Sequence, residues 1–310
     1  PAREKTVVYM AYDEATLFVA FKCYAAPNEI VANIRTRDAL EKSDDHVFIV
    51  LDTYHDKRSA FVFAVSPLGT QADLRVVDDG RNLDTRWDAE WQAATQGTDF
   101  GWSVEMAIPF SSLKYNQDLT TWGLNIGRVI RSNSETAYWS GRMNDDFRIS
   151  QGGTLDGIVT PAKYRPFKFV PYATIRHNDS SPKKDNDGVQ TEFGGDLFYN
   201  VTPSLTANLT YNPDFATVEG DRYQINLTRW EVSFPEKRLF FLEGQELYQT
   251  RIQSFYSRRI GDIEYGGKMV GKIDKYSMAV LAAQSSENFD ADQPQARWAF
   301  GRVKRDILKS

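Results

Sequence analysis

Alternation of apolar and polar residues, with almost no helical spacing, is the feature that most restricts how this 310-residue chain can fold. Segments rich in Val, Ile, Phe, Tyr and Thr recur, and Asp, Asn, Gly and Pro separate them. Short strands with turn residues between them are typical of sandwiches and barrels, so the sequence predicts an all-β protein. In the first half we expect strands at Lys5–Tyr12, Thr16–Tyr24, His46–Asp52, Ser59–Ser66, Ala72–Val77, Glu90–Thr95, Gly101–Ile108, Thr121–Ser132 and Thr136–Ser140.

Two local patterns refine this prediction for the first half. The run HVFIVLD at 46–52 is apolar at nearly every position, which indicates a central strand covered on both faces. The segment IPFSSLKY, which begins at Ile108, breaks the alternation, and Pro109 followed by two serines favours a short helical turn.

A boundary between two domains is expected near Gly152–Pro166, because this stretch is rich in Gly and Pro and lacks periodicity. We therefore predict a β-sandwich over residues 1–152 and a second β domain over residues 166–310. Each half is long enough to bury a core of its own.

The strands of the second half are long and strongly two-faced. In LTANLTY, Leu205, Leu209 and Tyr211 share one face, and threonines and an asparagine occupy the other. Such strands match the opening of an antiparallel outer-membrane β-barrel, whose polar face lines the lumen, although a soluble sheet gives the same alternation. If the barrel prediction is right, side chains such as Leu205, Leu209, Tyr211, Met278 and Val280 should point outward with no protein over them.

A long segment, about 212–261, interrupts these strands, and its Leu227, Trp230 and Phe234 have helical spacing. Segments of this length are usually functional or folded against something, so we expect an inserted, plug-like loop. The five or six strands after Pro166 are fewer than the roughly eight of the smallest single-chain barrels. We therefore expect a complete barrel to need further strands after Ser310.

Charge and cysteine content exclude some classes of protein. The formal net charge of −5 argues against a nucleic-acid partner, since such proteins usually present a basic face. The single cysteine, Cys23, cannot form an intramolecular disulfide, and its apolar neighbours predict a buried strand thiol.

Three blocks of the second half resemble a known family: NPDFATVEGD (212–221), INLTRWEVSFPEKRLFFLEG (225–244) and FYSRRIG (255–261). They are similar to segments of Gram-negative outer-membrane proteins whose C-terminal barrel domain has no assigned function. In that family a domain similar to carbohydrate-binding module family 9 precedes the barrel, and EKTVVYMAYDEATLFVAFKCY, SDDHVFIVLDT, WDAEWQAAT and GWSVEMAIPFSSLKY resemble its strands. The resemblance implies an outer-membrane location, with the N-terminal domain in the periplasm and lipid around the barrel.

The carbohydrate-binding candidates are aromatic side chains, because sugars stack on aromatic faces while a few polar groups bond their hydroxyls. Trp102 and Trp122 share faces with apolar strand residues, so we expect them in the core. The loop residue Trp87 and the strand-end residue Trp139 are the better candidates, together with the neighbouring Tyr138 and Arg142.

Acidic residues around one strand offer a possible structural Ca²⁺ site, although acidic loops are usually just solvated. The candidates are Asp45, Asp52 and Asp56, beside Asp44. We otherwise expect no cofactor. The sequence has neither a G-x-S-x-G elbow nor an H-E-x-x-H helix, so we expect no enzyme activity.

Basic and aromatic residues gather in the inserted segment. We expect Arg238, Arg258 and Arg259 to pair in the lumen with carboxylates such as Glu236 and Glu243; an ordinary loop with exposed ion pairs is the alternative.

Three functions remain open from the sequence. The first is a non-catalytic outer-membrane protein whose periplasmic domain binds glycans or assists their transport. The second is a structural barrel whose N-terminal domain docks other envelope proteins. The third is a soluble accessory module of a secreted glycoside hydrolase.

Overall fold

The computed structural model describes residues 2–39, 43–141, 143, 147–160, 167–178, 188–213, 234, 236–248, 250, 254–287 and 294–305. Contacts divide the chain into two units, Pro1–Tyr164 and Arg165–Lys309. All strand pairs are antiparallel, which confirms the all-β prediction. Within the described residues, no helix is long and apolar enough to cross a membrane.

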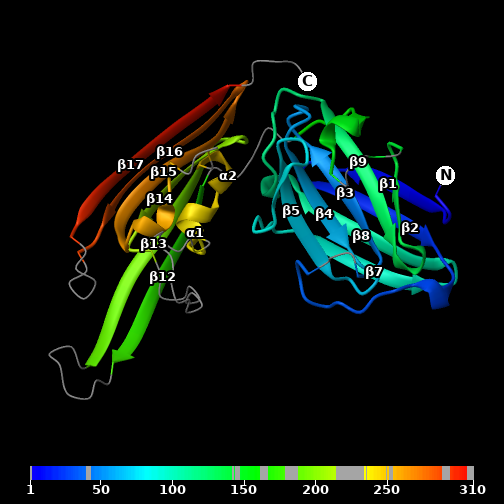
Figure 1. Ribbon diagram of the computed structural model, residues 1–310, viewed down its shortest axis with the longest axis horizontal. Coiled ribbons are helices and arrows are strands. Elements are labelled where there is room, and N and C mark those ends of the chain that lie inside the picture. The colour runs from blue at the N-terminus through cyan, green and yellow to red at the C-terminus, as the bar shows by residue number, and fades with distance from the viewer. Residues whose placement is uncertain are drawn as a thin grey trace, which may run out of the picture. The chain divides into compact units, whose positions relative to one another are not determined.

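The first unit is a sandwich of two sheets (Figure 1). The smaller sheet has the order β1 (Thr6–Tyr12), β2 (Thr16–Tyr24), β8 (Gly101–Pro109), β7 (Gln92–Thr98). The larger has the order β10 (Glu135–Tyr138), β9 (Thr121–Ile130), β3 (His46–Asp52), β4 (Ala60–Val65), β5 (Gln71–Val77), β6 (Asn82–Asp84). Four 3₁₀ turns join these strands: η1 (Pro27–Glu29), η2 (Phe110–Ser112), η3 (Arg131–Asn133) and η4 (Ile149–Gln151). Each strand expected in the first half is present, and η2 is the predicted turn.

Alternate residues of the strands fill the space between the two sheets. Trp102 on β8 and Trp122 on β9 are fully buried, as predicted, and Cys23 on β2 is buried beside them. Burial raises the pKa of the Cys23 thiol to about 12, so this thiol stays protonated. The free cysteine is therefore a core residue and not a nucleophile.

The outer face of the larger sheet is also covered, as the apolar run at 46–52 predicts. Phe48 and Val50 of β3 belong to a second apolar cluster with Ile149. Tyr138 and Phe147 pack edge-on against the Phe48 ring. A strand buried on both sides has no polar face, which explains its continuous apolar sequence.

The division after Tyr164 lies inside the boundary predicted near Gly152–Pro166, but the sandwich itself continues past residue 152, where its domain was predicted to end. A further strand, β11 (Gly153–Asp156), pairs with β9, and Ile158 is buried in the core. The linker prediction was therefore wrong for residues 153–158. A strand of four residues beside glycines is too short to show an alternation of apolar and polar side chains. Its conformation therefore depends on pairing with β9.

The second unit contains a six-stranded sheet in which chain neighbours pair in sequence. Its strands are β12 (Phe167–Asn178), β13 (Gly188–Thr202), β14 (Leu205–Tyr211), β15 (Ile263–Ile273), β16 (Tyr276–Ser285) and β17 (Ala296–Arg305). The described strands form an open series from β12 to β17 (Figure 1). Two short helices, α1 (Leu239–Leu242) and α2 (Gln245–Tyr248), and the 3₁₀ turn η5 (Ser257–Arg259) follow β14.

One face of this sheet, which we call the covered face, packs against the segment between β14 and β15. Phe240, Phe241 and Tyr248 of that segment form a buried cluster with Val270 and Leu281 of the sheet. The insertion predicted at 212–261 thus folds onto the sheet where it is described. Residues 214–233, including Leu227 and Trp230, lie outside the described residues.

The opposite face, which we call the open face, is apolar and exposed. Fourteen of the twenty large hydrophobic side chains exposed in the described part of the chain lie on β12–β17. Leu209, Tyr211 and Val280 are exposed, as expected for outward-pointing residues. Leu205 is 4% exposed and Met278 is partly buried, so the outward prediction was wrong for Leu205 and holds only in part for Met278. Alternation assigns Leu205 to a face but does not show that the strand end around it is covered.

Candidate functional site

Trp139 is an exposed aromatic residue of the sandwich. It follows β10, its backbone N–H donates to the Ile126 carbonyl, and its side chain is 58% exposed. The indole lies directly over Gly153, where even a Cβ atom would come within 2.5 Å of the ring. The six-membered part of the indole therefore packs against backbone, and the exposed part of the ring offers an aromatic surface of the kind on which sugars stack.

The neighbours predicted to join Trp139 are placed differently. Tyr138 is partly buried, with its ring 5.8 Å from that of Phe48 in the outer cluster of the larger sheet. Tyr138 therefore supports the sheet beside Trp139. Arg142 lies outside the described residues.

Trp87 is half-buried and packs against the edge of the core. Its ring lies 4.7 Å from Phe61 and 5.8 Å from Phe63. These contacts occupy much of the indole, so Trp87 has less free aromatic surface than Trp139.

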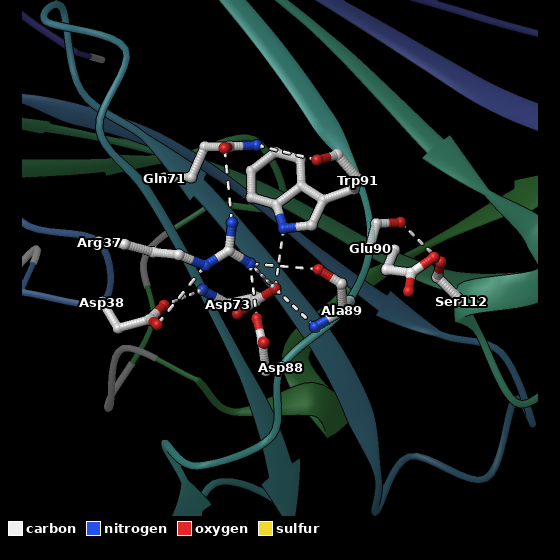
Figure 2. A network of polar contacts seen from close by, with 9 residues as sticks. All are labelled: Arg37, Asp38, Gln71, Asp73, Asp88, Ala89, Glu90, Trp91 and Ser112. Atoms are coloured by element: carbon white, nitrogen blue, oxygen red, sulfur yellow. Dashed lines mark hydrogen bonds and ion pairs between the residues drawn. The ribbon is translucent and has the colours of Figure 1, made fainter. Parts of the chain in front are cut away.

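A polar network that the sequence analysis did not identify is centred on Arg37 and Asp73 (Figure 2). Arg37 donates from Nη2 to Asp73 at 3.0 Å, to Asp88 at 2.7 Å and to the Ala89 carbonyl at 3.1 Å. Trp91 donates its indole N–H to the same Asp73 oxygen at 2.8 Å. The network joins two loops to β5. The feature of the sequence that could have indicated it is the charged Asp73 inside the strand QADLRVV.

Asp38, Asp73 and Asp88 bring carboxylate oxygens within 4.8 Å of one another. The Arg37 guanidinium lies against all three, which supplies the compensating charge that a metal ion would otherwise bring. Burial raises the pKa of Asp73 to about 6 in spite of the hydrogen bonds from Ala89 and Trp91 and the charge of Arg37. The cluster is thus best described as a structural ion-pair network.

The carboxylates predicted to bind Ca²⁺ instead receive backbone N–H groups. Asp45 accepts from Arg131 at 2.7 Å, Asp52 from Lys57 at 2.8 Å, and Asp56 from Arg58 at 2.8 Å. Asp45 directly precedes β3 and Asp52 is its last residue, so they lie about 23 Å apart at 3.3 Å per residue and cannot share an ion. Burial, followed by the nearby charge of Asp56, raises the pKa of Asp52 to about 7.

In the second unit, Glu236 and Arg238 form a buried clamp. Two parallel bonds join them, from Nε at 2.8 Å and from Nη2 at 2.7 Å. The same guanidinium donates to the carbonyls of Ser257 and Ile260, both at 2.7 Å, and lies 4.4 Å from the Phe241 ring. The clamp therefore holds two ends of the covering segment together through charge-assisted bonds.

The other residues predicted to face a lumen differ in burial and in contacts. Lys268 on the covered face donates to the Glu243 carbonyl at 3.0 Å, and its ammonium lies 3.6 Å from the Glu243 carboxylate. Arg258 is partly buried and Arg259 is exposed, both in η5. Of the residues predicted to pair in the lumen, Arg238 and Glu236 are thus the two that are buried, and they pair with each other.

Comparison with known proteins finds one family model and several similar solved structures. Residues 165–282, a little more than a third of the chain, match the family described as "Domain of unknown function (DUF5916)". Over about half of its length the chain is similar to a family 9 carbohydrate-binding module from Caldicellulosiruptor kristjanssonii. The glucose complex of that module has a TM-score of 0.39 and 16% identity, with coverage of 54% of this chain and 83% of the module. The cellotriose complex has a TM-score of 0.38 and 14% identity, with coverage of 53% and 78%. No curated protein matches.

Proposed function

We propose that this chain is a non-catalytic protein of the bacterial outer membrane, in which the open face of the six-stranded sheet contacts lipid and the sandwich stands in the periplasm and binds saccharide. The observation that carries the proposal is the inverted polarity of the sheet. Its covered face buries Asn208, Thr210 and Lys268, whereas its open face exposes leucine, valine, phenylalanine and tyrosine. A soluble protein seldom exposes an apolar surface that extends over several strands.

The distribution of tyrosine on the open face supports the same proposal. Tyr211 and Tyr265 are direct neighbours at one end of β14 and β15, and Tyr276 faces Ile273 at the other end of β15. The eight residue steps from Tyr265 to Ile273 span about 27 Å of strand, which projects to roughly 20 Å at a tilt of about 40°. That height is close to the ~25 Å apolar band of outer-membrane proteins, where tyrosine gathers at both interfaces.

Vesicle flotation of the full chain tests the membrane proposal. Leu209→Arg and Val280→Arg place a charge in the middle of the open face, at an expected cost of about 2–4 kcal/mol each in lipid. Phe18→Arg, on the exposed face of β2 in the sandwich, is the matched control. We expect the unaltered chain and Phe18→Arg to float with lipid and the two open-face variants to be depleted. Equal flotation of all four proteins, or of none, would contradict the proposal and favour the soluble accessory module.

Saccharide binding by the sandwich is proposed on the exposure of Trp139 over Gly153. Titration of the full chain with cellotriose and other plant and microbial oligosaccharides, followed by tryptophan fluorescence, tests it. We expect saturable binding that Trp139→Ala abolishes and that Tyr9→Ala, at another exposed aromatic residue of the sandwich, leaves unchanged. Binding that survives Trp139→Ala would show that the site is elsewhere. No binding to any sugar would favour a scaffold that docks envelope proteins.

We also propose that the sandwich does not catalyse a reaction, because two of its buried carboxylates, Asp52 and Asp73, already accept hydrogen bonds from the protein. Asp52 accepts two backbone N–H groups, and Asp73 accepts from a backbone N–H, Trp91 and Arg37. Carboxylates held in this way serve to fix loops. The test is hydrolysis of the sugars that bind: release of product that Asp52→Asn or Asp73→Asn abolishes would contradict this part of the proposal.

A further inference from the structure

The covered face of the six-stranded sheet carries a buried polar group formed by Asp196, Asn208 and Thr210. Asp196 on β13 pairs directly with Thr210 on β14, and Asn208 occupies the next position of β14 on the same face. Asn208 is 1% exposed and Thr210 is 4% exposed, while Asp196 is partly buried. We call these three residues the polar triad.

Polar atoms of the triad have no hydrogen-bond partner in the described part of the chain. They are both side-chain atoms of Asn208, the Thr210 hydroxyl and Oδ1 of Asp196, and all are shielded from solvent. Buried amides and hydroxyls in folded proteins are nearly always bonded to protein, ordered water or a ligand, because leaving them unpaired is costly.

Polar groups that neighbour the triad on the covered face are paired. One row away on the same strands, the Thr206 hydroxyl donates to Asn200 at 3.0 Å. On β15, the ammonium of Lys268 donates to the Glu243 carbonyl. Within the described residues, the triad gathers four unpaired atoms on two adjacent strands, whereas the other unpaired side-chain atom of the sheet, Nε1 of Trp298, lies on β17, three strands from β14.

The chemistry of the triad defines the occupant that fits it. Asp196 and Asn208 offer acceptor oxygens, the Asn208 amide offers donors, and the Thr210 hydroxyl can do either. Asp196 disfavours an anion, and Lys268, the direct cross-strand neighbour of Asn208, disfavours a cation. The occupant that fits is therefore a neutral group that both donates and accepts hydrogen bonds, and a hydroxyl is the simplest such group.

We infer that the polar triad is a binding site for neutral O–H groups, occupied by water and exchangeable for the hydroxyls of a small polyol. This site is separate from Trp139 of the sandwich, and the inference does not depend on whether the open face contacts lipid. Water bound at such a place makes two to four hydrogen bonds, and the triad can supply them.

The sign of a stability change tests the inference. Asn208→Leu and Thr210→Val remove three of the four unpaired atoms of the triad with little change in volume. If O–H groups occupy the triad, these variants lose bonds and melt at a lower temperature; if the triad is dry, they melt at a higher temperature because an unpaired polar group has been removed. Thr206→Val, at the paired hydroxyl one row away, is the control for loss of an ordinary hydrogen bond.

Calorimetric titration with xylitol separates a polyol from water. We expect saturable heat for the unaltered chain and for Thr206→Val, and affinity at least tenfold lower for Thr210→Val and Asn208→Leu. Lower melting temperatures of the triad variants without saturable heat identify water as the occupant and overturn the polyol part of the inference. Higher melting temperatures without saturable heat overturn all of it.

Thr210→Val alone decides the matter if Asn208→Leu does not fold, since it removes one hydroxyl. Because Trp139→Ala leaves the triad intact, failure of the sandwich to bind sugar is distinguishable from failure here.

Discussion

The sandwich and the six-stranded sheet are built from the same kind of alternating strand, but they bury opposite faces. In the sandwich, two sheets turn their apolar faces toward each other, and residues such as Lys22 and Glu105 remain on the exposed side. In the six-stranded sheet, the segment between β14 and β15 covers the more polar face, and the apolar face stays exposed. The comparison shows that alternation by itself does not say which face becomes the interior.

The largest expected difference between the two units is in the loss of stability when a phenylalanine of each is replaced by alanine. Phe63 is fully buried in the sandwich, and Phe193 is 68% exposed on the open face. Phe63→Ala should lower the stability of the sandwich by about 3–5 kcal/mol because it leaves a cavity. Phe193→Ala should change the six-stranded sheet in water by no more than about 0.5 kcal/mol. Hydrogen exchange measured by mass spectrometry follows each unit separately, and a large loss of protection in β13 of Phe193→Ala would show that the open face is packed.

The clamp on the covered face is the next most sensitive point. Arg238→Ala leaves the buried Glu236 carboxylate unpaired, which should cost about 3–5 kcal/mol. Hydrogen exchange should accelerate at residues 236–248 and 254–263, whereas the exposed Arg259→Ala in the same segment should leave it unchanged. Equal effects of the two variants would mean that the clamp does not hold the covering segment.

The stability of the sandwich should depend on pH, because several of its buried carboxyls have raised pKa values, two of them strongly. The pKa of Asp52 is about 7 and that of Asp73 about 6, against 3.8 ordinarily, so the folded state retains protons that the unfolded state releases. Stability should therefore fall by several kcal/mol as pH rises from about 4 to 7.

Urea denaturation at a series of pH values measures this dependence, and tryptophan fluorescence reports mainly the sandwich, which contains five of the seven tryptophans. Asp52→Asn should flatten the profile, and Glu105→Gln, at an exposed carboxylate, should not. A stability that rises over this range would contradict the assignment.

The smallest expected effect is at the surface end of the Arg37 network. The side chain of Asp88 is 72% exposed, and an exposed ion pair contributes about 0.2–1 kcal/mol. Asp88→Asn should therefore shift the urea midpoint of the sandwich only slightly, in contrast to the buried pair of Arg238. The shift should also shrink at high salt, and a loss as large as that of Arg238→Ala would indicate that Asp88 is shielded from water.

Much of the strand pattern was predictable because it depends on neighbours in sequence. The strands of the first half, the burial of Trp102 and Trp122, and the turn at Phe110–Ser112 all follow from local spacing. Strand β11 was not predictable, since its four residues show no alternation and acquire their conformation by pairing with β9.

The candidate site was predicted less completely. Trp139 is exposed as expected, but the contacts of Trp87 with Phe61 and Phe63 come from strand β4, distant in the sequence. The Arg37 network brings together residues from positions 37 to 91, a combination that no local pattern indicates.

The sequence by itself determined which residues share a face, because side chains of a strand alternate with a period of two. Leu209 and Tyr211 are together, and Asn208 and Thr210 are together, whatever the strand packs against. Only the tertiary structure decided which face is covered, because the covering residues, such as Phe240 and Phe241, come from a segment about 30 residues further along the chain. The burial of a strand face depends on its non-local partner, and a periodic pattern contains no information about that partner.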